Sequence, residues 1–312
     1  MNTYPTVQEV TMATQFSKGY IEKAMSEATK RAYGSDVRKF NQWCTANNVA
    51  SLPASPVTVA EYLAHCAKSG KKASTISRSV AAIRYVHKVY GFETPTTSPY
   101  VTATLSGIKR ELGTVQEQKK AISTGDLVDM IEKCPDTLIG LRDKAILALG
   151  FSGAFRRSEL ANLNVEDIKE NQKGMEITIR RSKTDKYGQG QKVAIINGRQ
   201  VKAIKHLKKW LAVAGIATGK VFRGVKQNGS LTASITGLSI GKIVKKYVGL
   251  IGLDSSDYGG HSLRAGYITE AAEHGASVFK IQEVSRHKRI DTVQLYVRNA
   301  ELFRNHSGAM FL

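Results

Sequence analysis

Apolar residues recur at helical spacing through the first part of the chain, and turns rich in Gly, Pro and Ser separate the periodic segments. We expect a first helix to open at Ser26, whose hydroxyl suits the position just before a helix. Three more helical segments follow at residues 57–68, 73–90 and 100–112. Helices that each carry one apolar face bury it most simply against one another, so this pattern predicts an α-helical bundle.

The rest of the chain mixes helical and strand patterns. Helical periodicity covers residues 123–133, 136–151, 199–214 and 236–251. Two β-rich runs, residues 176–180 and 192–196, flank a polar turn that contains glycine, which is typical of a hairpin. The chain is therefore expected to be mainly α, with an N-terminal helical bundle followed by an α-rich domain that carries a small antiparallel β-sheet.

A polar segment without periodicity, residues 113–120, separates the two regions and is expected to be a linker. At 312 residues the chain is long enough for two domains, each with its own core. Residues 1–18 show no periodicity, and we expect a flexible arm there. The predicted domains are then a helical domain over 19–112 and an α-rich domain over 121–312.

The charge of the chain changes the picture from an ordinary globular protein to one with a polyanionic partner. The hydrophobic content of 42% is ordinary, but the net charge of +20 points to nucleic acid. No acid lies between Glu61 and Glu93, and none lies between Asp185 and Asp254, where thirteen Lys and Arg occur. One such stretch is usually a solvated face. Two of them, far apart in the chain, favour a surface that follows a phosphate backbone.

Other classes find no support in the residues. No apolar run is long enough to span a bilayer, and residues at the start show no signal-peptide pattern, so we expect no membrane partner. The three cysteines, Cys44, Cys66 and Cys134, lack metal-ligand spacing, and Cys44 and Cys66 lie among apolar neighbours. We expect reduced core thiols, a reducing cytoplasm, and neither a metal nor another cofactor.

The candidate chemistry lies in residues 260–296. His261 and Arg264 are three apart, as on one face of a helix; His287 follows, and Tyr296 ends the stretch in a helical pattern. Cations on one face, with imidazole and phenol groups nearby, suit a phosphate. Taken alone, H-x-x-R usually marks polar residues on a core helix. The residues found earlier in the chain decide between these interpretations.

Those residues are Arg156, in the run RRSEL, and Lys183, in the turn of the predicted hairpin. In chain order the set continues with His261-Ser-Leu-Arg264, His287 and Tyr296. This resembles the tyrosine recombinase (phage integrase) family, whose pattern is R…K…H-x-x-R…H/W…Y. The resemblance runs from about Ser26 to the C-terminus and is to simple, two-domain recombinases of the Cre or Xer type. The family's R-x-S-E-L motif selects Arg156 rather than the arginine that follows it.

The resemblance implies an enzyme that cuts and rejoins DNA at specific sites, through a 3′-phosphotyrosine and a Holliday junction. Tyr296 would be the nucleophile. A free phenol has a pKa of roughly 10, so it needs a cationic site and a base to attack. Arg156 and Arg264 would supply permanently charged forks to the phosphoryl oxygens.

By the same resemblance, Lys183 would protonate the departing 5′ oxygen and His261 would act in proton transfer at the tyrosine. His287 would hold a phosphoryl oxygen, and Glu159 would orient the basic groups. One position departs from the pattern: Arg286 stands where many relatives have glycine before the histidine.

Two groups of residues are expected to contact double-stranded DNA. In the first domain they are Lys30, Arg31, Arg38, Lys71, Lys72, Ser74 and Arg78. In the second they are Thr232, Ser234, Lys242, Lys245 and Lys246.

The C-terminal segment, residues 299–312, is too apolar for a solvated end. It either folds back onto its own domain or, as the resemblance implies, docks into a neighbouring protomer, giving a homotetramer on DNA and a monomer when free. Two other functions stay open. They are a nicking-closing enzyme of the type IB topoisomerase kind and a DNA-binding accessory protein without activity. A small bundle in place of an encircling cap argues against the first, and the complete catalytic set argues against the second.

Overall fold

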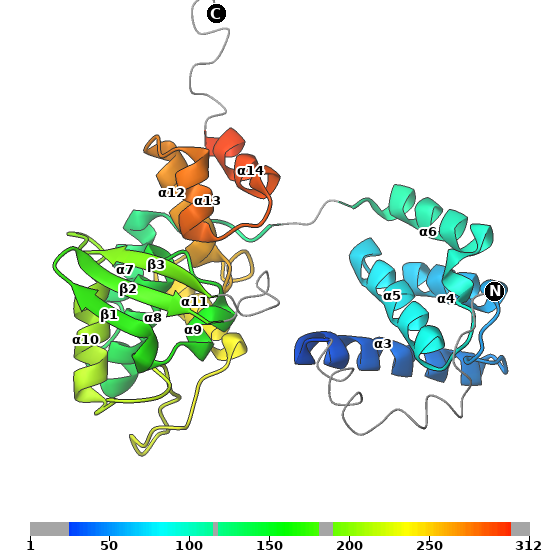
Figure 1. The fold of residues 1–312 in the computed structure, drawn as a ribbon, viewed down its shortest axis with the longest axis horizontal. Helices are drawn as coiled ribbons and strands as arrows, with labels where there is room; N and C mark the ends of the chain where they lie inside the picture. Colours follow the sequence, from blue (N-terminus) through cyan, green and yellow to red (C-terminus); the bar gives the residue numbers. More distant parts are fainter. Residues whose placement is uncertain (1–24, 115–117, 181–189, 301–312) are drawn as a thin grey trace, which may run out of the picture. The chain divides into compact units, whose positions relative to one another are not determined.

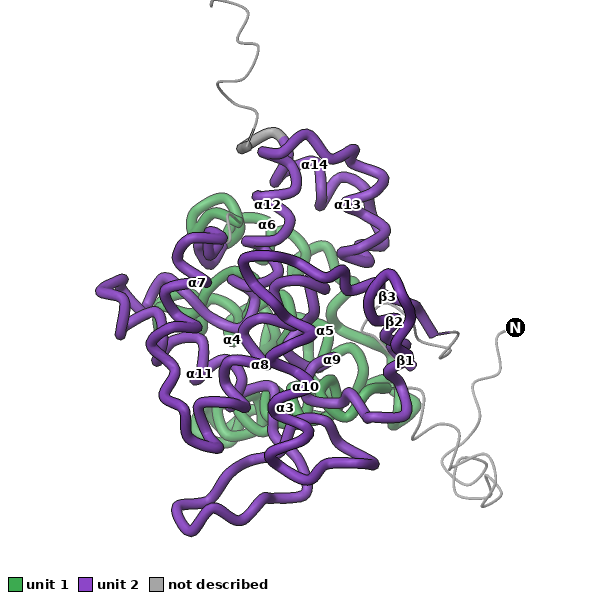
Figure 2. Tube along the Cα trace, turned by 90° about the vertical axis from the view of Figure 1, so that its left-hand side faces the viewer, with its two compact units in different colours: residues 1–117 green, residues 118–312 purple. Residues whose placement is uncertain are grey.

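The computed structural model describes residues 25–114, 118–180 and 190–300 (Figure 1). The chain divides into two compact units, Met1–Glu117 and Gln118–Leu312, which are coloured separately in Figure 2. Each unit has a hydrophobic core of its own, so each is described by itself. The predicted fold class, mainly α with a small antiparallel sheet, is confirmed.

Unit 1 is a helical bundle. Its helices are α3 (Glu27–Ala46), α4 (Pro56–Lys68), α5 (Ala73–Val89), the short η1 (Pro95–Thr97) and α6 (Pro99–Leu112). Serine hydroxyls accept the first free N–H groups of three of them: Ser26 from Thr29 at 3.2 Å, Ser55 at 3.0 Å and Ser98 at 3.3 Å. These caps explain why the helices begin where the sequence predicts them to begin.

The core of unit 1 lies between α3, α4, α5 and α6. Its fully buried side chains include Phe40, Leu63, Ile83 and Val101, one from each helix. Each comes from the apolar stripe of its own helix, and together they close one continuous core. The predicted core thiols, Cys44 and Cys66, are buried and reduced, and so is Cys134 in unit 2.

Unit 2 is larger and mixed. Its helices are α7 (Thr124–Glu132), α8 (Leu138–Ser152), α9 (Arg157–Asn162), η2 (Val165–Asp167), α10 (Ala203–Val213), α11 (Gly237–Leu250), α12 (Ser262–Glu273), α13 (Val278–Ser285) and α14 (Ile290–Ala300). Helix α8 is buried along most of its length and runs through the core, with Ala145 to Leu149 all fully buried. The predicted helix over 199–214 begins later, at Ala203, because Lys202 adopts a left-handed conformation with φ of 50°.

The sheet has three antiparallel strands in the order β1–β2–β3: β1 (Ile168–Asn171), β2 (Gly174–Ile179) and β3 (Gln191–Ile196). In the β2–β3 pairing Ile177 lies opposite Val193, and both face the core. The predicted hairpin is therefore present. Strand β1 was not predicted, because its sequence, IKEN, is polar and mostly exposed and carries no alternating pattern.

Helices α12, α13 and α14 lie together at one end of unit 2 (Figure 1). They close a small cluster of their own around Ile268, Ile281 and Val293. Gly266 allows α12 to approach the main chain, since a Cβ there would lie 2.0 Å from the carbonyl oxygen of Ile122. The C-terminal helices are thus anchored at α12. From this helix the candidate residue Arg264 reaches the loop after α8.

Candidate active site

Four separate segments bring the candidate residues together. The loop after α8 leads into α9 at Arg156, and α12 begins just after His261 and carries Arg264 in its first turn. The turn between α13 and α14 carries His287, and α14 carries Tyr296. His261 is the residue that precedes the helix, and its φ of −88° and ψ of −18° continue the helical path, so the predicted common face with Arg264 holds.

Arg156 and Glu159 form a closed pair at the start of α9. The N–H of Arg156 donates to Oε2 of Glu159 at 2.9 Å, and Nη1 donates to Oε1 at 2.6 Å. The neighbouring Arg157 is exposed and packs beside Gly260 instead. The structure thus brings Arg156, and not Arg157, to the cluster, as the family motif predicts.

Glu159 is buried, with 5% of its surface exposed, and is ionised by its partners. Burial alone opposes its charge, but the guanidinium of Arg286 and the hydrogen bonds from Arg156 hold its pKa below the ordinary value. Its Oε2 also accepts from Nη2 of Arg286 at 2.9 Å. A single carboxylate therefore ties two arginines that are 130 residues apart in sequence.

Arg264 is 3% exposed and only half satisfied. Its Nη1 donates to the carbonyl oxygen of Ala154 at 2.7 Å, whereas Nη2 has no hydrogen-bond partner among the described residues. Burial, together with Arg156 and Arg286, lowers its pKa to about 9. A buried, unpaired guanidinium edge costs free energy unless an anion meets it, so this edge indicates an anion site.

His287 lies beside the arginines and is held from its own loop. Its Nδ1 and Oγ of Ser285 are 2.9 Å apart, and its carbonyl oxygen accepts from Nε2 of Gln282 at 3.0 Å. Burial and then the nearby positive charges, Arg264 foremost, lower the pKa of His287 to about 3. His261 contributes to that shift, which places both imidazoles around the same space. At neutral pH His287 is therefore an uncharged imidazole.

Tyr296 is half-buried on α14 and packs against the small cluster of α12 and α13. Burial raises the pKa of its phenol, and the charge of Arg264 opposes that rise. The tyrosine in turn affects the pKa of Arg264. These mutual effects mean that the phenol lies within the electrostatic reach of the Arg264 guanidinium.

Arg286, the departure from the family pattern, is a member of the cluster. Its φ of 58° and ψ of 41° are left-handed, a conformation that costs a non-glycine residue about 1–2 kcal/mol. Its side chain is 2% exposed, and its own carbonyl oxygen accepts from Nη2 of Arg156 at 3.0 Å. The sequence showed only that this position differs from the family. That the side chain turns inward depends on the fold.

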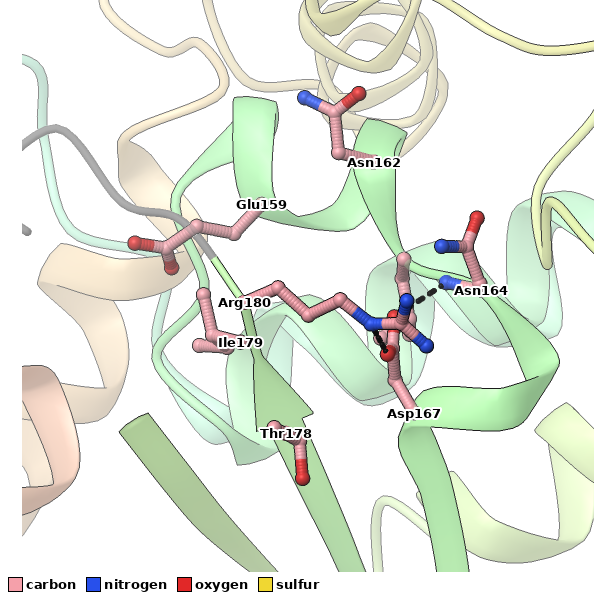
Figure 3. Close-up of a pocket in the computed structure, with 8 residues that line it drawn as sticks. Glu159, Asn162, Asn164, Asp167, Thr178, Ile179 and Arg180 are labelled. Atoms are coloured by element: carbon pink, nitrogen blue, oxygen red, sulfur yellow. Dashed lines mark hydrogen bonds and ion pairs between the residues drawn. The ribbon is translucent and has the colours of Figure 1, made fainter. Parts of the chain in front are cut away.

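Lys183 lies outside the described residues. The strand before it, β2, ends beside α9, where a cavity of about 360 Å³ is lined by Glu159 and Ile179 among others (Figure 3). At its edge Arg180 points to Asp167 and forms an ion pair with it. The described part of this segment ends at Arg180, three residues before Lys183 and on the Glu159 side of the cluster.

The candidate DNA contacts of unit 1 are on α3 and at the start of α5. Most are exposed, but two already have acidic partners. Lys30 donates to Glu27 at 2.8 Å, and Arg78 binds both oxygens of the buried Asp36, at 2.7 and 3.1 Å. Arg31, Arg38, Lys71, Lys72 and Ser74 are exposed.

Those of unit 2 differ among themselves. Lys242, Lys245 and Lys246 are exposed on α11, where Nζ of Lys246 also lies 4.8 Å from the ring centre of Tyr247. Ser234 is exposed as well. The hydroxyl of Thr232 is engaged inside its loop: it donates to the carbonyl oxygen of Ser234 at 2.7 Å and accepts from Gly224 N–H at 2.8 Å. The Thr232 hydroxyl therefore stabilises its own loop.

Within the described parts of the chain, no three His, Cys, Asp or Glu side chains gather as a metal would need. No described helix is long and apolar enough to cross a membrane.

Comparisons with known proteins agree with this geometry. The sequence profile of the Phage integrase family matches residues 120–302, and that of the phage integrase N-terminal SAM-like domain matches residues 13–90. The integrase/recombinase xerD homolog of Selenomonas ruminantium is 39% identical over 300 residues, which are 93% of this chain and 87% of that protein. Recombinase cre of Escherichia phage P1 is 27% identical over 312 residues, which are 92% and 88% of the two chains.

Solved structures show the same fold. The XerH site-specific recombinase bound to palindromic difH substrate, in its post-cleavage complex, matches 90% of this chain and 79% of its own. The TM-score is 0.68 at 17% sequence identity. The profile match covers more than half of the chain, and the match to the Selenomonas protein covers nearly all of it. The chain therefore belongs to the phage integrase family, the tyrosine recombinases.

Proposed function

We propose that this chain is a site-specific DNA recombinase whose nucleophile is Tyr296 and whose phosphate-binding groups are Arg156 and Arg264. One observation carries the proposal: Nη2 of Arg264 is buried without a hydrogen-bond partner among the described residues, in a group whose charge acts on the Tyr296 phenol. An anion that reaches this edge is also within the field of Arg156 and Arg286, which lower the pKa of Arg264. These features support a site that binds a phosphate next to the proposed nucleophile.

Charge stabilisation comes from the arginines. Attack on a phosphodiester adds negative charge to the non-bridging oxygens, and preorganised cations in a water-poor site stabilise that charge. The guanidinium of Arg264 is fixed by Ala154 and that of Arg156 by Glu159, so neither has to reorganise during the reaction. A planar fork also matches two phosphoryl oxygens at once.

The covalent step exchanges one phosphodiester for another. The Tyr296 oxygen forms a bond to phosphorus while the bond from phosphorus to the DNA 5′ oxygen breaks, and the product is a 3′-phosphotyrosine. The phenol gives up its proton, for which we assign His261 as the acceptor. The 5′ oxygen takes up a proton, for which we assign Lys183. The 5′ oxygen of the partner duplex then forms a bond to phosphorus while the bond from phosphorus to the Tyr296 oxygen breaks. Lys183 takes the proton of the 5′ hydroxyl and His261 returns a proton to the phenol, so both groups recover their first state and no ATP is consumed.

His287 acts as a neutral hydrogen-bonding group. Its low pKa, about 3, follows from burial and from the arginines, so it adds no charge to the free site. Ser285 holds one ring nitrogen at 2.9 Å, which leaves the other for a phosphoryl oxygen. A bound phosphate would partly cancel the field of the arginines and raise the pKa of the ring.

The assembly follows from the same family. The XerH relative is described as bound to its DNA substrate, which supports double-stranded DNA with a specific site as the partner of this chain. Both units carry exposed basic helices for it. We propose further that the segment 299–312 docks into a neighbouring protomer, so that four copies assemble on two sites and the free protein is a monomer. The chain would act in the cytoplasm, on the nucleoid.

The test is a map of covalent attachment. Incubating the protein with fragmented genomic DNA and sequencing the ends that remain linked to protein after denaturation should return one or a few discrete sites. Tyr296→Phe should bind the same fragments and form no adduct. Tyr258→Phe is the matched control, since Tyr258 is 7% exposed in the same unit. An adduct that survives in Tyr296→Phe would assign the nucleophile elsewhere, and no adduct with wild type would reject the recombinase.

A further inference from the structure

Arg286 occupies a backbone conformation that suits glycine and yet carries a large, charged, buried side chain. A residue kept in a left-handed conformation is held there by its surroundings. At this position the surroundings are specific, because two of the groups that bind the side chain, the Ala154 carbonyl and the Glu159 carboxylate, also bind Arg264 and Arg156.

The guanidinium of Arg286 is bound on both of its outer nitrogens. Nη1 donates to the carbonyl oxygen of Gly153 at 3.0 Å and to that of Val284. Nη2 donates to the carbonyl oxygen of Ala154 at 3.0 Å and to Oε2 of Glu159 at 2.9 Å. Its Cζ lies 5.2 Å from the ring centre of Phe155. The side chain therefore spans the whole loop between α8 and α9.

Two of those partners connect Arg286 to the arginines of the site. The Ala154 oxygen that it binds also binds Nη1 of Arg264, at 2.7 Å. The Glu159 oxygen that it binds also accepts the N–H of Arg156, at 2.9 Å. The carbonyl oxygen of Arg286 itself accepts from Nη2 of Arg156, at 3.0 Å. One residue thus touches the supports of both phosphate-binding arginines.

The charge balance gives this arrangement a consequence. Glu159 forms ion pairs with Arg156 and Arg286, and its charge also acts on Arg264, so three cations face one carboxylate in the described part of the cluster. Without Arg286, the carboxylate would be left to Arg156 alone and would cancel most of its field at a bound phosphate. With Arg286 in place, half of the carboxylate is engaged elsewhere, and the site keeps a larger excess of positive charge.

We propose that Arg286 is a positioning residue for DNA cleavage: it shares Glu159 with Arg156, so that the carboxylate does not act against the charge of Arg156 alone, and it fixes the loop that orients Arg264. The inference rests on the proposed function, because it concerns the same phosphate site. It assigns to this chain a charged group at a position where many relatives have glycine and so carry no side chain.

The experiment compares three variants on the attachment site mapped with wild-type protein. Arg286→Gln keeps the length without the charge, Arg286→Lys keeps the charge without the fork, and Arg286→Gly suits the backbone and removes the side chain. The readouts are the rate of covalent adduct formation, the Kd for the same duplex and the Tm. Partners one layer out from a reacting group change activity by about 10–100-fold, so we expect Gln to slow the adduct by that factor. Lys should recover part of the rate, and the Kd should stay within about threefold.

A second substrate separates an electrostatic role from a purely structural one. In a methylphosphonate linkage the negatively charged oxygen is replaced by a methyl group, so the transition state carries one negative charge fewer and depends less on cations. The defect of Arg286→Gln should then shrink to within about threefold of wild type. A defect of equal size on both linkages would mean that Arg286 only holds the loop, and it would overturn the proposal.

The remaining outcomes are also decisive. Wild-type rates in Arg286→Gln or in Arg286→Gly overturn the inference and leave the recombinase intact. If none of the three variants folds, Arg286 is a structural residue and the inference is equally overturned. If wild-type protein forms no Tyr296-dependent adduct, the proposed function fails and the inference fails with it, which the mapping experiment shows before any variant is made.

Discussion

Arg264 donates through Nη1 to the carbonyl oxygen of Ala154 at 2.7 Å, and the other edge of the same guanidinium has no partner among the described residues. The carbonyl is available because Ala154 turns the chain with a φ of 45° at the end of α8. A hydrogen bond from a charged guanidinium to a carbonyl oxygen is stronger than one between neutral groups. The turn after α8 thus fixes one edge of Arg264 and leaves the other for the substrate.

Arg264→Lys tests whether one edge of the guanidinium binds Ala154 while the other binds the substrate phosphate. Lysine keeps a positive charge but has no second edge to bind phosphate once its ammonium is held by Ala154. We expect adduct formation to fall by roughly 10²–10³-fold, with the Kd for the duplex nearly unchanged. Arg289→Lys, at an arginine 80% exposed in the same unit, is the control and should cleave like wild type. Cleavage by Arg264→Lys within a few fold of wild type would contradict the assignment.

The pH dependence of stability should report on His287. Its pKa is about 3 in the folded protein against an ordinary value near 6.5, so the unfolded chain binds a proton in this window that the folded chain does not. The free energy of unfolding therefore falls as pH drops from about 6.5 toward 3. His287→Gln removes this term, and its Tm should decline less steeply than that of wild type over the same range.

Carboxylates titrate in the same window, so the comparison is between the slopes of the two proteins and not their absolute values. The exposed His274→Gln serves as the matched control and should retain the wild-type slope. Parallel curves for wild type and His287→Gln would mean that His287 titrates normally.

Cleavage should proceed in the presence of a chelator. The transition-state charge is assigned to the guanidinium groups of Arg156 and Arg264, so no metal ion is needed to stabilise it. The rate of adduct formation on the mapped site should be the same in EDTA and in Mg²⁺. A reaction that stops in EDTA and recovers with added Mg²⁺ would show that the arginines do not suffice.

The apolar tail gives a prediction about assembly. Deleting residues 307–312 should leave the Tm of the free protein and its binding to a single site unchanged, while pairing of two sites and strand exchange are lost. The tail would then act on a neighbouring copy. Gel shifts with one and with two sites, beside thermal melting, separate the cases. A lower Tm for the truncated monomer would show that the tail packs on its own domain.

Local patterns accounted for most of the secondary structure. The serines that open α3 and α4 are capping residues in the folded chain, and the apolar stripes became the two cores. Strand β1 escaped because a short, exposed, polar strand has no periodicity of its own. It forms because β2 offers it a paired edge, which is a property of the fold and not of the segment.

The site divides in the same way. The order of Arg156, His261, Arg264, His287 and Tyr296 was visible as a motif, and the described fold brings all five together. The role of Arg286 could not be predicted from the sequence. Arginine is usually exposed, and only the folded loop shows that this one is buried. The sequence also does not show whether a basic residue is already paired with an acidic side chain.

The last case is Arg78, whose Nε and Nη2 are held by the buried Asp36, leaving Nη1 outside that ion pair. If Nη1 contacts a phosphate, Arg78→Met should weaken DNA binding and lower the slope of log Kd against log salt by about 0.9. Asp36→Asn keeps the charge of Arg78 but removes that of its partner and loosens the clamp, so the slope should match wild type while the affinity falls by a smaller factor. Arg110→Met removes an equal charge from exposed α6, outside the candidate set, and is the control for net charge alone. Identical slopes for Arg78→Met and Arg110→Met would show that Arg78 only joins α3 to α5. Arg78→Met should then still lower the stability of the protein, because it leaves the buried carboxylate of Asp36 without its partner.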